Sequence, residues 1–292
     1  MRIAFAALAC ALLPACTSPP DAGPTAEPIV ATERAFAADG YETGVKASFV
    51  KYAAPGAMMF APGPVNVHDY FAGQPDAAPN PDRPHLVWWP LAAGIAASGD
   101  LGFTTGPYGL GDKRYGWYFT VWQRQGDGSW KWVLDAGVDA DPSAAAPQDS
   151  PVAYLPASEE TAMSPDAAMA EVKAIEAGMA AAAGTDLAAS YEGQLSHDAR
   201  LHTEGAAPGT APETWAAALA ARPAAMSLAP MGGGASAAGD MVWTWSEAHW
   251  QADAPPVRGF VVRVWQRRAD GWKIVFDELV PWNGPDPDAA AE

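Results

Sequence analysis

Apolar residues recur at helical spacing after residue 164. Four of them stand three or four positions apart and therefore share one face of a helix: Met169, Val172, Ile175 and Met179. The preceding Ser164-Pro165 is typical of a helix start, because the Ser side chain accepts a hydrogen bond from a free backbone amide and Pro fits the first turn. The pattern predicts a helix that ends at Gly184.

Shorter helical signals precede and follow this segment. Thr185 can cap a second helix, and a third begins at Thr210, where Glu213 completes a capping box. Near the N-terminus, residues 29–38 and 43–52 predict two helices separated by a break at Asp39-Gly40. Each half of the chain is therefore expected to begin with helices.

Toward the end of each half, the apolar period changes from helical to two, as in β-strands. Residues 117–122 and 260–265 alternate in this way, and an Asp-Gly pair follows each strand. Asp-Gly favours the tight turn of a β-hairpin, so Asp127 and Asp270 are interpreted as turn residues without a chemical role.

The two halves repeat one another. VWQRQGDGSWKWVLD at 121–135 returns as VWQRRADGWKIVFD at 264–277, and residues 89–100 parallel residues 229–240. A tandem pair of domains explains this repetition, and Pro-rich stretches separate the pieces. We predict a tether over 16–28, a first domain over 29–138, a linker over 139–158, a second domain over 159–282 and a disordered tail over 283–292.

Helices followed by a curved antiparallel sheet, with a last hairpin of the form VWxRxxDGxWK, resemble the nuclear transport factor 2-like superfamily. Residues 88–108 and 118–135 look most like its SnoaL-like branch and the branch called domain of unknown function 4440. The resemblance implies an α+β fold of two cone domains in tandem, each with helices packed on a curved antiparallel sheet. Because single domains of this superfamily often pair through their sheets, an intramolecular pseudo-dimer is expected. The sequence leaves open whether the face that carries Tyr118, Thr120 and Trp122 points into the cone or outward.

The N-terminus has the pattern of a bacterial lipoprotein signal over residues 1–15. Arg2 precedes an apolar run that is too short to cross a bilayer and has the length of a signal-peptide core. Leu13-Pro14-Ala15-Cys16 resembles a lipobox, which implies acylation of Cys16 and membrane attachment through the acyl groups. An ordinary cleaved secretory signal is the alternative. We expect a lipoprotein of the bacterial cell envelope that faces the periplasm, on the outer membrane in a two-membrane organism because Thr17 follows the Cys.

Charge, cysteine content and motifs limit the kinds of partner and bound group that the chain is expected to have. The chain has 17 basic and 34 acidic residues, a formal charge of −17, which repels nucleic-acid phosphates, so no nucleic acid is expected. Of the two cysteines, Cys10 lies within the signal, so Cys16 has no partner for an intramolecular disulfide. His197 and His202 would face opposite sides of a strand, and no phosphate-binding motif occurs, so neither a metal nor a cofactor is expected.

Four ionisable residues are candidates for catalytic chemistry. Asp135 and Asp277 end the last strand of each domain, and ketosteroid isomerase-like members of the superfamily use a pocket carboxylate as a base. Glu247 and His249 share one face of a strand, where a carboxylate and an imidazole can exchange a proton. The alternative is a strand-end residue that faces solvent or bonds to a neighbouring loop. Arg263 lies among apolar residues and needs a buried acid or a ligand beside it.

Aromatic residues favour the first domain as the one with the better-formed pocket. The candidates for pocket residues are Trp88, Trp89, Phe103, Tyr108, Tyr118 and, in the second domain, Arg263. The leading function is an envelope lipoprotein that binds a small hydrophobic molecule or acts as a scaffold, without assignable catalysis. The alternatives are a proton-transfer enzyme like ketosteroid isomerases or polyketide cyclases, and a pure protein-interaction module whose cones are filled with side chains.

Overall fold

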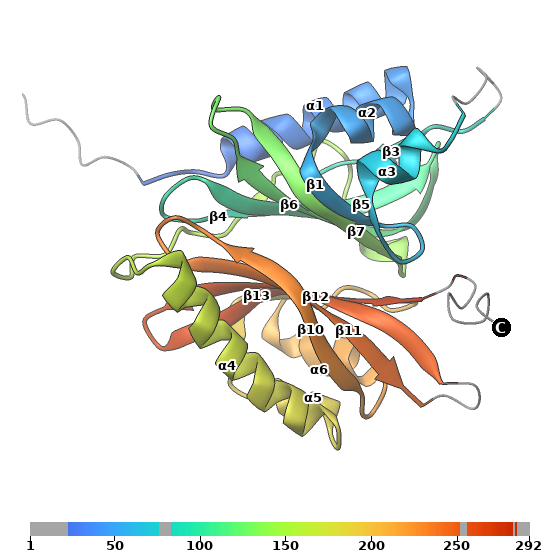
Figure 1. Ribbon diagram of the computed structural model, residues 1–292. Helices are drawn as coiled ribbons and strands as arrows, with labels where there is room; N and C mark the ends of the chain where they lie inside the picture. Colours follow the sequence, from blue (N-terminus) through green and yellow to red (C-terminus); the bar gives the residue numbers. More distant parts are fainter. Residues whose placement is uncertain (1–22, 76–82, 252–255, 283, 285–292) are drawn as a thin grey trace, which may run out of the picture.

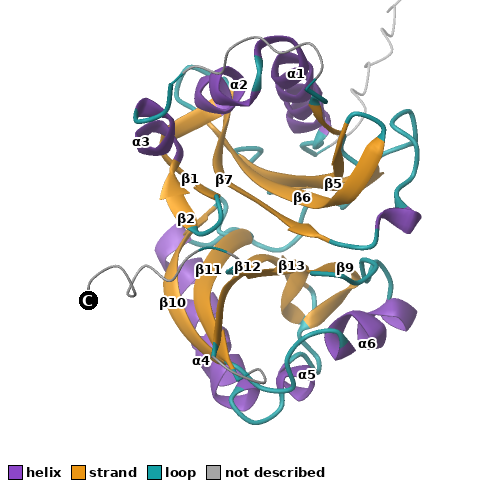
Figure 2. Cartoon of the chain, turned by 90° about the vertical axis from the view of Figure 1, so that its right-hand side faces the viewer, coloured by secondary structure: helices purple, strands orange, loops and turns teal. Residues whose placement is uncertain are grey.

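Two β-sheets lie face to face, and helices cover the outer face of each sheet (Figures 1 and 2). The structure is a computed structural model and describes residues 23–75, 83–251, 256–282 and 284. The chain completes one sheet with its helices before it starts the other, and we call α1 to β8 the first unit and α4 to β13 the second unit. This arrangement confirms the predicted α+β class with helices packed on curved sheets.

The first unit is built on an eight-stranded sheet. Its helices are α1 (Glu27–Thr43), α2 (Val45–Tyr52) and α3 (Val67–Ala72). Its strands are β1 (Ala53–Phe60), β2 (Pro64–Asn66), β3 (Leu86–Trp88), β4 (Ala92–Ile95), β5 (Leu101–Leu110), β6 (Lys113–Arg124), β7 (Trp130–Asp139) and β8 (Ala153–Tyr154). They follow the order β2-β1-β7-β6-β5-β4-β8, with β3 also paired to β5; the β1–β7 and β4–β8 pairs are parallel.

The second unit repeats this plan with a five-stranded sheet. Its helices are α4 (Pro165–Ala183), α5 (Leu187–Ser190) and α6 (Pro212–Ala220). Its strands are β9 (Leu195–Thr203), β10 (Ser227–Ala235), β11 (Met241–Trp250), β12 (Val257–Arg268) and β13 (Gly271–Pro281), in the order β10-β11-β12-β13-β9. β9 pairs with β13 in parallel, as β1 pairs with β7 in the first unit.

The predicted break at Asp39-Gly40 is wrong. α1 continues to Thr43 and the chain bends at Gly44, whose φ of 89° suits glycine. Gly40 serves a different purpose, because a Cβ at this position would stand 2.7 Å from the Trp88 ring. The glycine lets the helix approach β3 closely, and the helix runs through it.

The helix starts of the second unit are partly as predicted. Ser164 caps α4 by accepting a hydrogen bond from the Ala167 amide at 3.2 Å. The helix expected from Thr185 is only a single turn, α5, and Asp186 caps it. The helix is short because Leu195, expected within it, already belongs to β9. At α6 it is Thr214, not Glu213, whose side chain accepts from the backbone amides before the helix.

Alternation along β6 separates two cores. Tyr118 and Trp122 face the helices of the first unit, whereas Trp117, Phe119 and Val121 face the other sheet. β12 alternates in the same way: Val261 and Trp265 face helices, and Phe260, Val262 and Val264 face the first sheet. The question that the sequence left open is thereby answered, because the side with Tyr118 and Trp122 points into the cone.

Contacts between the two sheets are aromatic at the centre and polar at one end. The rings of Phe119 and Phe276 stack with centroids 3.8 Å apart. At the end, the Asp240 carboxylate accepts from the Ala97 amide at 2.8 Å, and the Asp100 carboxylate accepts from the Ala237 amide at 3.0 Å. These paired bonds join equivalent turns of the repeated segment reciprocally, as in an interface with twofold symmetry.

Several segments predicted from the sequence lie wholly or partly outside the described residues. Residues 1–22, with the expected signal and Cys16, fall outside the described residues, as does the tail apart from Gly284. Within the predicted linker, Pro142–Ala144 forms a 3₁₀ turn and β8 pairs with β4. No helix in the described ranges is both long and apolar enough to span a membrane.

Candidate functional site

A pocket with aromatic walls opens at the end of the first unit where α1, α2 and α3 meet the sheet. Its volume is about 370 Å³. One acid, Asp135, lies among its lining residues, which otherwise are apolar, aromatic or glycine: Phe36, Val45, Phe49, Met59, Phe60, Ala61, Tyr70, Phe71, Leu86, Trp88, Tyr108, Tyr118, Ala136 and Gly137. A pocket that is mostly apolar and contains one polar group is typical of small-molecule binding sites.

β7 presents Asp135 to this pocket. The residue stands opposite Thr120 of β6, and the Thr120 hydroxyl donates to its Oδ2 at 2.8 Å. Burial raises the pKa of Asp135 to about 8, and the charge of Glu33 adds to the rise, while the Thr120 hydrogen bond opposes it. The carboxyl group is thus mostly protonated at neutral pH and remains partly exposed on the pocket side.

Tyrosine hydroxyls accompany this carboxyl group. Tyr118, two positions before Thr120 on the same face of β6, lines the pocket, and its buried hydroxyl has no hydrogen-bond partner in the described structure. Burial and the nearby carboxylates of Glu33 and Asp135 raise its pKa well above the ordinary value. The Tyr108 hydroxyl instead donates to Asp139.

A buried glutamate fixes the helix against the sheet behind the pocket. Glu33 of α1 accepts from the Trp88 indole at 2.6 Å, the Thr104 hydroxyl at 2.5 Å and the Trp122 indole at 3.0 Å. Burial raises the pKa of Glu33 to about 7 despite these three donors. The second unit repeats the device with Glu176, which accepts from Thr244 and Trp265.

The equivalent of Asp135 in the second unit is fully enclosed. The Asp277 side chain is 0% exposed and accepts from Arg263 Nε at 2.7 Å, Arg222 Nη1 at 2.5 Å and the Tyr191 hydroxyl at 2.9 Å. Burial alone would raise the pKa of Asp277, but the charges of Arg222 and Arg263 outweigh it and hold the pKa below the ordinary value. These three partners enclose the carboxylate, so Asp277 and Arg263 belong to a structural ion-pair network.

The other residues expected in a site are dispersed. Trp88, Tyr108 and Tyr118 share the pocket with Asp135, whereas Phe103 lies in the core between the sheets. The Trp89 indole points away from the pocket and donates to the Ala146 carbonyl at 3.1 Å, under the Arg114 side chain. Its neighbour Trp88 takes the inward position because successive strand residues point to opposite faces.

Glu247 and His249 lie at an exposed strand end. Their side chains contact each other at 2.9 Å, and Arg258 also pairs with Glu247 at 2.5 Å. The His249 side chain is 51% exposed, so water screens this cluster. The alternative of ordinary solvent-facing polar residues describes this position.

Several pocket residues were missed from the sequence. Phe49, Tyr70 and Phe71 come from α2 and α3, and α3 is too short for a periodic signal. Arg222, which secures Asp277, follows α6 at a distance of 55 residues from its partner. The repeat offset could have revealed Glu33 and Glu176, which occupy equivalent helix positions.

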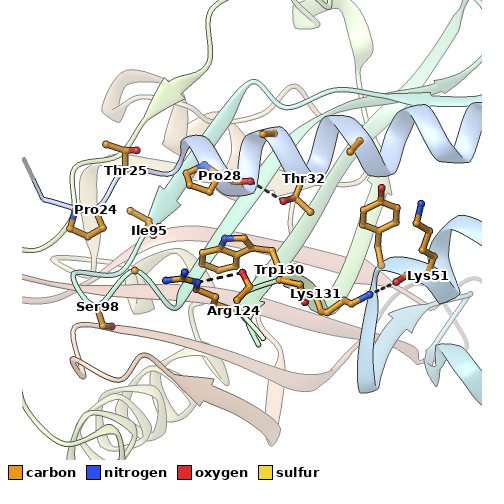
Figure 3. A pocket seen from close by; sticks show the side chains of 16 residues that line it. Pro24, Thr25, Pro28, Thr32, Lys51, Ile95, Ser98, Arg124, Trp130 and Lys131 are labelled. Carbon is orange, nitrogen blue, oxygen red and sulfur yellow. Dashed lines mark hydrogen bonds between the residues drawn. The ribbon is translucent and has the colours of Figure 1, made fainter. Parts of the chain in front are cut away.

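A second hollow of about 850 Å³ lies beside the start of α1 (Figure 3). Lys51, Arg124 and Lys131 line it together with Trp130, and none of its described lining residues is an acid. Its cations are already engaged at the surface: Lys51 pairs with Asp39, and Lys131 donates to the Lys51 carbonyl. Because it lies open to solvent and none of its described lining residues has a buried polar side-chain atom without a partner, it is the weaker candidate.

No cluster of three or more His, Cys, Asp or Glu side chains suited to a metal occurs in the described part of the chain. His202, considered above, is buried between the sheets with its Nδ1 3.1 Å from Glu278 Oε2. Burial, helped by the charges of Arg200 and Arg222, lowers the pKa of His202 to about 3. This imidazole is therefore uncharged.

Comparison with known proteins gives similarity at the level of shape. No protein-family model and no curated protein sequence matches the chain. Among solved structures, a protein of unknown function of the DUF3225 family from Pectobacterium atrosepticum is 19% identical and covers 39% of this chain and 91% of its own, with a TM-score of 0.34. An NTF-2-like protein of unknown function from Shewanella oneidensis is 13% identical over 38% of this chain and 97% of its own, with a TM-score of 0.32.

An enzyme is also among the similar structures. SalBIII, an epoxide hydrolase/cyclase-like enzyme in pyran ring formation of salinomycin, is 18% identical over 39% of this chain and 92% of its own, with a TM-score of 0.30. At such identities and TM-scores these similarities carry no argument about activity.

Proposed function

We propose that the first unit binds a small, mostly apolar molecule in the pocket above Asp135, while the second unit acts as its packing partner. The observation that carries this proposal is the contrast between two equivalent aspartates. Asp135 borders an open aromatic pocket, and Asp277 is closed off by two arginines and a tyrosine. The polar group of the ligand meets Asp135, and its apolar body lies along the aromatic walls.

The second unit supports the wall of this pocket. Phe60 lines it and packs on Phe260 of the second unit, with ring centroids 5.2 Å apart, and on Trp245 at 6.1 Å. Binding assays therefore need the full chain, because the isolated first unit would lose this support.

Calorimetric titration of the full chain with 4-biphenylmethanol tests the binding function. We expect saturable binding that Val45→Arg weakens about tenfold, because a charge at the rim must be desolvated beside the ligand. Leu110→Arg is the matched control, since Leu110 is 40% exposed, against 38% for Val45, and does not line the pocket. Failure of a panel of aromatic and steroid-like compounds to bind would refute the proposal.

A second candidate, proton transfer, is favoured by the raised pKa of Asp135, because a base with a pKa near the working pH exchanges protons efficiently. Asp135 would take a proton from the carbon beside a ligand carbonyl and return it to another carbon. Deuterium exchange into a β,γ-unsaturated cyclic ketone, followed by NMR, tests this. We expect the protein to catalyse this exchange and Asp135→Asn to abolish the catalysis. Exchange at the uncatalysed rate would refute proton transfer and leave ligand binding as the only proposed function of the pocket.

We also propose that the protein works at the membrane of a bacterial cell envelope, held through acyl groups on Cys16. The lipobox-like sequence and the Pro-rich residues that follow it support this proposal. Intact mass of the protein purified from membranes tests it, with an acylated chain that begins at Cys16 as the expected result. A mature N-terminus elsewhere without lipid contradicts it.

A further inference from the structure

The pocket of the first unit contains a carboxyl group without a basic partner. No Lys, Arg or His is among the described residues that line it. Thr120 supplies the one hydrogen bond that Asp135 makes in the described structure, through Oδ2. The other oxygen is left for whatever enters the pocket. By contrast, the equivalent Asp277 is neutralised by Arg222 and Arg263.

The walls of the pocket also favour positive charge. The faces of aromatic rings carry partial negative charge and attract cations. The rings that line the pocket are Phe36, Phe49, Phe60, Tyr70, Phe71, Trp88, Tyr108 and Tyr118. An anionic ligand would find no compensating cation among the described residues that line the pocket, so the lining disfavours an anion.

We propose that the ligand of the first unit is an apolar amine that binds as its ammonium ion, with the nitrogen at Asp135 and the hydrocarbon body against the aromatic walls. This inference rests on the proposed binding function and adds the chemical class of the ligand. The ammonium supplies the counter-charge that Arg222 and Arg263 supply in the second unit. The aromatic walls replace part of the water that the ion loses on entry.

Proton release gives this binding mode a characteristic pH dependence. The titratable groups around Asp135 are Tyr118 on β6, Tyr108 on β5, Tyr70 on α3, Glu33 on α1 and, across the sheet interface, Glu278. All are acids that are neutral when protonated, so none supplies positive charge. Because Asp135 holds a proton below pH 8 and must lose it to pair with an ammonium, affinity should rise about tenfold per pH unit up to that point.

The test compares two probes of the same shape. Calorimetric titration of the full chain with 4-phenylbenzylamine and with 4-biphenylmethanol, between about pH 6 and pH 8, separates charge from shape. We expect the amine to bind more tightly at the upper end, with affinity that falls about tenfold per unit of acidification. The alcohol should bind with little change over the same range.

Variants locate the charge pair. Asp135→Asn keeps the size and the Thr120 hydrogen bond, and it should remove both the preference for the amine over the alcohol and the pH dependence of amine binding. Asp127→Asn removes an exposed turn carboxylate of the adjoining hairpin and should change neither. Equal affinity for amine and alcohol, or an amine preference that survives Asp135→Asn, overturns the inference and leaves the binding function intact. Binding of neither probe overturns the inference, and failure of the wider panel as well would refute the binding function.

Discussion

One aspartate position, used twice, distinguishes the two units. Thr120 stands opposite Asp135 in one sheet, and Arg263 stands opposite Asp277 in the other. The hydroxyl leaves room for a pocket, whereas the guanidinium, with Arg222 beside it, fills the cone. A single cross-strand exchange, supported by an arginine from the loop after α6, thus separates a binding cavity from a packed core.

Opposite stability effects are expected when each aspartate is changed to asparagine. For Asp135, the pKa rises from 3.8 to about 8 on folding, so the native state binds more protons and the free energy of unfolding falls as pH rises through this range. Asp135→Asn removes that loss and should be more stable than the parent by a few kcal/mol at about pH 8, and equally stable near pH 4.

Asp277→Asn should destabilise the protein by about 3–5 kcal/mol, because Arg222 and Arg263 would remain buried without a full counter-charge. Because folding lowers the pKa of Asp277, the destabilisation by Asp277→Asn should be present at every pH above the ordinary range of aspartate titration. It should disappear in acid, where Asp277 of the parent protein is itself protonated. Urea unfolding at several pH values measures both variants. Similar losses from both substitutions at pH 8 would mean that Asp135 is paired in solution.

At the residue level, the sequence shows Asp135 and Asp277 as equivalent, since the repeat aligns them. It could not tell them apart. The difference depends on Arg222 and Tyr191, which only the folded chain brings to Asp277, and on helices α2 and α3, which enclose the space above Asp135. Charge pairing across 55 or more residues leaves no local pattern.

Hairpins were the most predictable elements. Alternation over 117–122 and 260–265 with an Asp-Gly turn matches β6–β7 and β12–β13, and the Asp127 carboxylate accepts from the Ser129 amide at 2.9 Å as a turn residue does. Helix breaks were less predictable, because Gly40 and Gly44 look alike in sequence. Packing against Trp88 explains the first glycine and a positive φ the second.

The turns through which the two units hydrogen-bond to each other can be tested by substitution. Asp240 is 1% exposed, and its carboxylate accepts from the Ala97 amide of the other unit and from the Ser236 hydroxyl. Asp240→Ala should lower the free energy of unfolding by about 1–3 kcal/mol, because these buried donors lose their acceptor. Hydrogen exchange should accelerate at the Ala97 amide, which lies 143 residues away in the chain.

Asp240→Asn is the matched control, since its side-chain oxygen can still accept from Ala97 and should preserve most of the protection. Asp100→Ala breaks the reciprocal bond to Ala237 but at an exposed turn, so its loss should be smaller. Unchanged exchange at Ala97 in Asp240→Ala would show that the turns are held apart from one another in solution.

On the largest scale, the repeat predicted two cones, but it could not show how much core they share. The inner sheet faces contribute Phe103, Trp117 and Phe119 from the first unit and Phe260, Val262 and Phe276 from the second to one cluster. Separated units would each expose an apolar sheet face, and such patches promote association. We therefore propose that the two units behave as a pseudo-dimer that stays together without the connecting chain.

Cutting the connection tests this proposal. Thr161 and Ala162 are exposed and lie between β8 and α4, so a protease recognition site inserted between them should be cleaved without damage to either unit. We expect the two fragments to co-elute at the size of the intact chain in gel filtration and to keep the calorimetric signal of the probe, because the shared core outweighs the lost connection. Phe119→Ala, which removes the ring stacked on Phe276, should weaken the nicked pair far more than the continuous chain, where the tether keeps the effective concentration high. Elution as two separate folded fragments would contradict a shared core and indicate that each cone is stable alone.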